Sequence, residues 1–108
     1  MFSTRLDHFS SSNETDVFNM RYIMDDQFYR DKNNSNPEIA NYSQPILFYA
    51  GNEGDIWDFY DNTGFISELA NMTGGMVVYA EHRYFGQSFP FPQDVALESP
   101  YNTWLTIE

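Results

Sequence analysis

Residues 45–55, with the sequence PILFYAGNEGD, decide the fold of this chain. Residues 45–50 form an apolar run without polar interruption, which ends at Gly51, and a second run, MVVYA, occupies residues 76–80. Strands that lack an alternation of polar and apolar residues are typical of parallel sheets, in which helices cover both faces. We therefore expect two buried parallel strands at these two runs.

A helix is predicted between the two runs, over residues 64–72. One face of this helix would carry the apolar side chains of Phe65, Ile66, Leu69 and Ala70. Asn62 or Thr63 is the expected N-cap, and Gly74 and Gly75 would end the helix. A strand, a helix and a strand, with about 25 residues between the strands, form a right-handed βαβ crossover.

The chain before these runs predicts antiparallel strands. Residues 6–9 form a short candidate strand, and residues 17–24 alternate as a half-buried strand does. One face of the second strand would carry Phe18, Met20, Tyr22 and Met24. Residues 30–43 and 85–100 are expected to be surface loops. A helix is expected to begin at Thr106, which suggests a longer protein.

The fold class is therefore α/β, with antiparallel first strands and then a βαβ unit, and we expect residues 1–108 to be only the N-terminal part of a domain. Ten Phe, eight Tyr and two Trp supply apolar area for a core. Sixteen acidic residues against five basic ones give a net charge of −11, so nucleic acid and anionic membranes are poor partners. No stretch approaches the length of a membrane span. The absence of Cys leaves the redox compartment open.

Four Asn-x-Ser/Thr acceptors favour the secretory pathway, although Asn-rich loops also produce such triplets by chance. They are Asn13, Asn33, Asn41 and Asn71. No signal peptide follows Met1, and we expect this residue to be an internal Met or the start of a truncated sequence.

The first candidate for chemistry is the loop Gly51, Asn52, Glu53 and Gly54, directly after the first apolar run. Ligands of open α/β sheets bind at the carboxyl ends of strands, and glycines let backbone N–H groups approach a substrate oxygen, as in an oxyanion hole. The alternative is a simple glycine-rich turn. The loop is not a phosphate loop, because the Gly-Lys-Ser/Thr ending is missing.

The second candidate is Glu81, His82 and Arg83, which follow the second apolar run. They could brace a site as a charged network. The alternative is a structural cluster in which Arg83 pairs with Glu81 or Glu53. For His82 we favour a structural role over that of a general base or metal ligand, because no other His or Cys stands at metal-ligand spacing, and we expect no metal.

Three further groups of residues are not expected to be catalytic. Ser88 has Pro90 where a nucleophile elbow needs Gly, and it lies in a Pro-rich loop. Asp7 and His8 are neighbours on a strand and would point to opposite faces. Four aromatic residues are most simply core or pocket wall: Trp57, Phe59, Tyr60 and Phe65.

Five segments carry a resemblance to a known family. They are RLDHF (5–9), FNMRY (18–22), ILFYAGNEGDI (46–56), NTGF (62–65) and VYAEHRYFGQS (78–88). In this order they resemble the prolylcarboxypeptidase family of serine peptidases, which includes the quiescent-cell proline dipeptidase (dipeptidyl peptidase II) and the thymus-specific serine protease. The resemblance covers nearly the whole chain.

The resemblance implies an α/β-hydrolase sheet and a helical cap domain, in lysosomal or secreted glycoproteins without a cofactor. Such peptidases cleave peptides with proline near a terminus, either as carboxypeptidases or as dipeptidyl peptidases, and a homodimer is conceivable for the intact protein. The catalytic Ser, Asp and His would all follow Glu108, so residues 1–108 would be inactive alone. Asn52 or Glu53 would donate one oxyanion N–H, and we hypothesise that the Glu53 carboxylate helps to hold substrate or Arg83.

Two other functions stay open. The chain could be a short non-catalytic product that binds a partner through an exposed sheet edge. An esterase or lipase on the same fold is a weaker alternative, since a fold does not fix a function.

Overall fold

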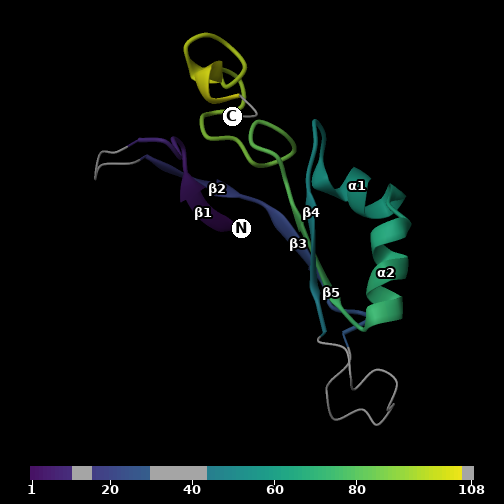
Figure 1. Cartoon of the computed structure of the whole chain (residues 1–108). Coiled ribbons are helices and arrows are strands. Elements are labelled where there is room, and N and C mark those ends of the chain that lie inside the picture. Colours follow the sequence, from purple (N-terminus) through teal and green to yellow (C-terminus); the bar gives the residue numbers. More distant parts are fainter. Residues whose placement is uncertain (11–15, 30–43, 106–108) are drawn as a thin grey trace.

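The computed structural model describes residues 1–10, 16–29 and 44–105 (Figure 1). The elements are β1 (Phe2–Arg5), β2 (Val17–Met20), β3 (Tyr22–Asp25), β4 (Ile46–Ala50), α1 (Ile56–Asn62), α2 (Phe65–Thr73), β5 (Met76–Ala80) and the 3₁₀ helix η1 (Tyr101–Trp104). Residues 85–100 contain no helix or strand, as expected for a loop. The acceptors Asn13, Asn33 and Asn41, the 30–43 loop and the helix expected at Thr106 lie outside the described residues. None of the helices that the structure describes is long and apolar enough to cross a membrane.

The predicted βαβ unit is confirmed. β4 and β5 pair in parallel, with Ile46 opposite Met76 and Ala50 opposite Ala80. β3 pairs antiparallel with the other edge of β5, so the order is β3-β5-β4 and β5 is the central strand. Because both β4 and β5 run in the same direction, their carboxyl ends lie together at one edge of the sheet.

β1 and β2 form a separate two-stranded antiparallel sheet, with Phe2 opposite Met20. The prediction of a strand at residues 6–9 is wrong, because β1 ends at Arg5. The Asp7 carboxylate accepts the Phe9 N–H at 2.9 Å. An aspartate that bonds a backbone N–H two residues on forms a turn, which is incompatible with an extended strand.

The single strand predicted at residues 17–24 is divided at Arg21 into β2 and β3. At this residue the chain leaves the first sheet for the second, and the Arg21 carbonyl accepts the Glu81 N–H at 3.0 Å. Phe18 is buried as expected, but Tyr22 and Met24 are exposed, so the prediction for these two is wrong. Ile23, between them on the other face of β3, packs against the core.

The helical region holds two helices rather than the one predicted. α1 begins after Asp55, whose carboxylate caps it by accepting the Trp57 N–H at 2.9 Å. Thr63, predicted as an N-cap of α2, is the C-cap of α1, and Gly64 precedes α2 instead. Gly74 ends α2 as predicted, in the left-handed conformation with φ 65°.

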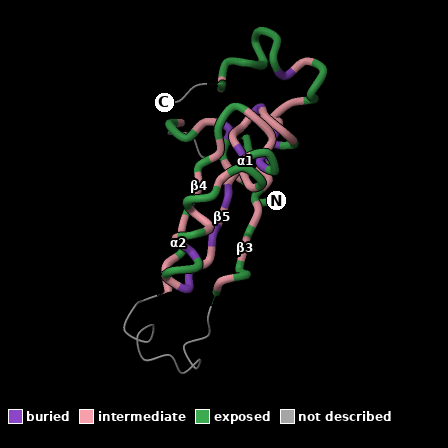
Figure 2. Tube along the Cα trace, turned by 90° about the vertical axis from the view of Figure 1, so that its right-hand side faces the viewer, coloured by how far each residue is buried: buried purple, intermediate pink, exposed green. Residues whose placement is uncertain are grey.

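α1 and α2 cover one face of the sheet (Figure 1), and the core lies between them and β5, where the buried segments concentrate (Figure 2). Its fully buried members are Ile56, Ala70, Val77 and Tyr79, with Phe59 and Tyr60 packed against them. The opposite face is uncovered within the described residues, where Ile46 is 67% and Phe48 64% exposed. The expectation that both faces of β4 are buried is therefore wrong for this chain. Phe65, expected in the helix core, is 78% exposed, and Trp57 is also exposed.

Candidate functional site

The structure brings together the two segments that the sequence singled out. The loop 51–54 follows β4, the residues Glu81 to Arg83 follow β5, and the Gly51 N–H donates to the Ala80 carbonyl at 2.7 Å. A Cβ at position 51 would overlap this carbonyl and lie 3.1 Å from the His82 nitrogen. Only glycine therefore permits this close approach between the two strand ends.

Asn52 closes the loop on itself. Its side-chain oxygen accepts the Glu53 N–H at 2.8 Å, and its carbonyl accepts the Gly54 N–H at 2.7 Å. The Gly51 N–H donates to the carbonyl of Ala80, the last residue of β5. No described residue accepts a hydrogen bond from the Asn52 N–H. Within the described part of the chain, the Asn52 N–H is therefore the one backbone donor of residues 51–54 that is free to bind a ligand.

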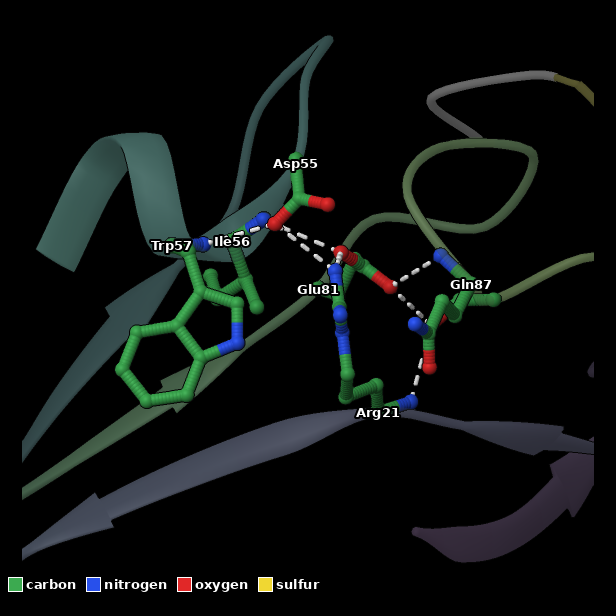
Figure 3. Close-up of polar contacts among 7 residues, drawn as sticks. Arg21, Asp55, Ile56, Trp57, Glu81 and Gln87 are labelled. Atoms are coloured by element: carbon green, nitrogen blue, oxygen red, sulfur yellow. Dashed lines mark hydrogen bonds and ion pairs between the residues drawn. The ribbon is translucent and has the colours of Figure 1, made fainter.

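The Glu81 side chain is the most heavily bonded group in the site (Figure 3). Its exposed fraction is 1%, and its carboxylate accepts four hydrogen bonds. The donors are the Arg21 guanidinium, the Ile56 N–H at 2.9 Å, the Gln87 N–H at 2.9 Å and the Ser88 hydroxyl at 2.7 Å. One carboxylate thus joins β5 to the start of α1, to the junction of β2 and β3, and to the turn at residues 84–88.

The charges in this cluster are compensated. Burial by itself would raise the pKa of Glu81, but the hydrogen bonds from Arg21, Ile56, Gln87 and Ser88 outweigh it and lower the pKa. The hydrogen bond from Arg21 lowers the pKa of Asp55. The same Arg21 nitrogen contacts Glu81 and, at 2.7 Å, Asp55, so both carboxylates are held ionised.

Sequence reasoning did not single out Arg21. The only local signal is a charged residue in the middle of an otherwise alternating strand. The guanidinium lies largely away from solvent, where a charge needs a partner. Its partner, Glu81, is 60 residues away in the sequence, and nothing local identifies it.

The predicted pairing of Arg83 with Glu81 or Glu53 is wrong. The Arg83 guanidinium donates to the Leu6 carbonyl at 2.7 Å and lies over the Phe18 ring, 5.3 Å from its centroid. Arg83 therefore fastens the N-terminal hairpin to the end of β5.

The geometry of His82 supports a structural role. Its Nδ1 lies 2.7 Å from the Arg83 carbonyl, and its ring packs edge-on against Phe85. Within the part of the chain that the structure describes, no group of three or more His, Cys, Asp or Glu side chains could hold a metal ion.

The geometry of Ser88 agrees with its rejection as a nucleophile. Ser88 is fully buried, and its hydroxyl accepts the Arg21 N–H at 2.8 Å while donating to Glu81. His8 is exposed, and the carboxylate of Asp7 is engaged by the Phe9 N–H.

A cavity of about 610 Å³ opens beside the loop. Its lining includes Leu6, His8, Phe48, Gly51, His82 and Trp104. The cavity is therefore bounded by the N-terminal segment, the carboxyl ends of β4 and β5, and η1. This is the edge at which open α/β sheets bind ligands.

This chain is similar in sequence to a family of known proteins. The family described as serine carboxypeptidase S28 matches residues 4–99. The "Lysosomal Pro-X carboxypeptidase" proteins of Pongo abelii and Homo sapiens are each 39% identical over 107 residues, which are 99% of this chain and 19% of the relative. The "Prolyl carboxy peptidase like protein 5" of Caenorhabditis elegans is 36% identical over 89 residues, 82% of this chain and 15% of the relative. The chain thus spans 15% to 19% of the length of these curated relatives.

Proposed function

From the premise that the chain belongs to the serine carboxypeptidase S28 family, we propose that the intact protein is a serine peptidase that works by acyl transfer, with this chain supplying part of its oxyanion hole. In such a mechanism a serine attacks the peptide carbonyl, a histidine moves the proton, and N–H groups stabilise the oxyanion. The Ser, Asp and His of this mechanism lie outside residues 1–108.

The observation that carries this proposal is the Asn52 N–H at the carboxyl end of β4. Among the described residues it is the one donor of the loop without an acceptor, and it belongs to the residue that follows Gly51, which lines the cavity. Preorganised N–H donors at such a position stabilise the charge that develops on the carbonyl oxygen. The Glu53 N–H, the alternative donor, is occupied by the Asn52 side chain.

The proposed substrates are peptides with proline near a terminus. The relatives named as Pro-X carboxypeptidases support this class of substrate. We favour release of the C-terminal residue after proline over release of an N-terminal dipeptide. A lysosomal or secreted location, an α/β-hydrolase core and a homodimer belong to the same proposal. The strand order β3-β5-β4, with helices on one face, is compatible with such a core.

Fluorophosphonate labelling of the natural protein tests this function. The protein is captured with an antibody against residues 44–57, and its mass is read on a gel. We expect a labelled band several times heavier than 12.7 kDa, and heat-denatured protein serves as the unlabelled control. Blocked peptides that end in Pro-Phe or Ala-Phe, and a free-amine peptide with proline second, then separate the two exopeptidase classes.

A second function has one observation in its favour. Within the described residues β4 is an edge strand, and Ile46 and Phe48 on it are exposed. Such an edge can pair with another strand, so a short non-catalytic form could bind a partner there. An unlabelled band at the mass of this chain supports that function and contradicts the peptidase.

A further inference from the structure

The loop that carries the Asn52 N–H is held at both ends by residues 80 and 81. At the first end, the Gly51 N–H donates to the Ala80 carbonyl at 2.7 Å. At the second end, the Ile56 N–H donates to the Glu81 carboxylate at 2.9 Å. Between these two points the loop bonds mainly to itself, so its position depends on the end of β5.

A second connection to the same loop runs through Arg21. Its guanidinium bridges Glu81 and Asp55, and the Asp55 carboxylate also caps α1 (Figure 3). Glu81 therefore fixes the Arg21 guanidinium through an ion pair, and Arg21 fixes Asp55, the last residue before α1, through a second ion pair. Glu81 thus holds Ile56, the residue at which α1 begins, directly, and holds Asp55 through Arg21.

The bonds to Glu81 require an ionised carboxylate. All four of its partners are donors, and a carboxylate offers acceptor positions on both oxygens. A glutamine of the same size would turn its NH₂ group toward two of these donors. Such a buried mismatch forces the groups around it to move.

We infer that Glu81 is a positioning residue of the proposed oxyanion hole, because its carboxylate sets where the Asn52 N–H lies relative to the end of β5. This inference rests on the proposed function. The Glu81 side chain is only 1% exposed, and its carboxylate is engaged by four donors of the protein itself. A displaced donor weakens binding of the transition state much more than binding of the substrate.

The test compares Glu81→Gln with the matched control Glu68→Gln, an exposed carboxylate on α2, both in the intact protein. The measurements are kcat, KM, the affinity for a peptide boronate that mimics the tetrahedral intermediate, and the affinity for the product peptide. For Glu81→Gln we expect kcat and boronate affinity to fall together, by about 10- to 100-fold. KM and product affinity should stay within about twofold. Glu68→Gln should match the wild type.

A folded Glu81→Gln protein with wild-type kcat would overturn the inference, and so would equal losses of product and boronate affinity. If this variant does not fold, Asp55→Asn tests the same connection, because asparagine can still cap the helix but carries no charge to pair with Arg21. For Asp55→Asn, a smaller fall in kcat and boronate affinity, with KM and product affinity unchanged, supports the inference. Unchanged kcat and boronate affinity overturn it. A wild-type protein that neither labels nor cleaves peptides overturns the proposed function as well. An active wild type with an unaffected Glu81→Gln overturns the inference alone.

Discussion

The backbone of Gly86 lies directly against the carboxylate of Glu81, and no room remains between them for a side chain. A Cβ at position 86 would overlap Oε2 of Glu81 and come within 2.7 Å of the Arg21 guanidinium. Gly86 also has φ +56°, a conformation that other residues adopt only with strain. The turn at residues 84–88 can therefore wrap around the buried carboxylate only with glycine at this position.

In the intact protein, Gly86→Ala is expected to lower the free energy of unfolding by about 2 to 4 kcal/mol, because the strain of the positive φ and the overlap with Glu81 add up. The free energy of unfolding from chemical denaturation measures this loss. Gly64→Ala is the matched control, since nothing lies within 4 Å of a Cβ at that position. Its effect should stay within about 0.5 kcal/mol. Equal changes in the free energy of unfolding for the two variants would show that the close contact between Gly86 and Glu81 does not require glycine.

The stability contributed by Glu81 should depend on pH. Its pKa is lowered in the folded protein. A group of this kind stabilises the fold above its unfolded pKa, and this contribution is lost as the pH falls through the folded value. The advantage of the wild type over Glu81→Gln should therefore be complete near neutral pH and shrink below about pH 4. Denaturation of both proteins across this range gives the difference. A difference that stays constant down to the acid limit would contradict a lowered pKa, and Glu68→Gln provides the baseline.

Much of the fold was predictable because the signals are local. The apolar runs at β4 and β5, separated by a helix, predict a parallel pair, and a parallel pair places Gly51 beside the residues after β5. Gly74 marks the end of α2 because only glycine adopts the left-handed conformation without cost. α1 was missed because its seven residues are too few to show a helical period.

The polar partners in the site were not predictable to the same degree. Arg83 stands two residues from Glu81, which suggested an ion pair, but the chain turns after β5 and directs Arg83 to the Leu6 carbonyl. The true partner of Glu81 is Arg21, which only the packing of β3 against β5 brings close. Ion pairs between distant segments depend on strand order and register, and a single sequence does not contain these directly.

Glu53 is predicted to contact the substrate rather than Arg83. Its side chain is exposed on the loop, one residue after the proposed oxyanion donor. Glu53→Gln in the intact enzyme should raise KM by about two- to tenfold, as expected for the loss of an exposed charge contact. Steady-state kinetics with a proline peptide measure this change, with Glu68→Gln as the control. Unchanged kinetics would show that the carboxylate has no part in binding.

Asn71 is predicted to carry an N-linked glycan. It lies exposed near the end of α2, followed by Met72 and Thr73, which complete the acceptor triplet. In the natural protein, peptide N-glycosidase should convert Asn71 to Asp, and mass spectrometry of the tryptic peptide detects the change. Asn71→Gln should remove one glycan from the mass, while Asn62→Gln, outside any triplet, should not. An unmodified Asn71 peptide from secreted or lysosomal protein would contradict this prediction.

The 108-residue chain produced by itself is expected to be poorly soluble or molten. Its Cα radius of gyration is 17.4 Å, whereas a compact domain of this length has about 13 Å. The uncovered sheet face exposes Ile46 and Phe48, and exposed apolar surface of this kind favours aggregation.

The measurement is the thermal unfolding of the isolated chain, followed by near-UV circular dichroism and dye binding. We expect strong dye binding and no sharp transition. Ile46→Thr with Phe48→Thr should raise solubility, because threonine keeps the strand preference and removes exposed apolar area. Leu47→Thr, a change on the helix-covered face of the same strand, should lower solubility instead, since Leu47 packs against the core. A sharp cooperative melt of the unaltered chain as a monomer would contradict the prediction and would show that the core around Val77 and Tyr79 suffices for an independent fold.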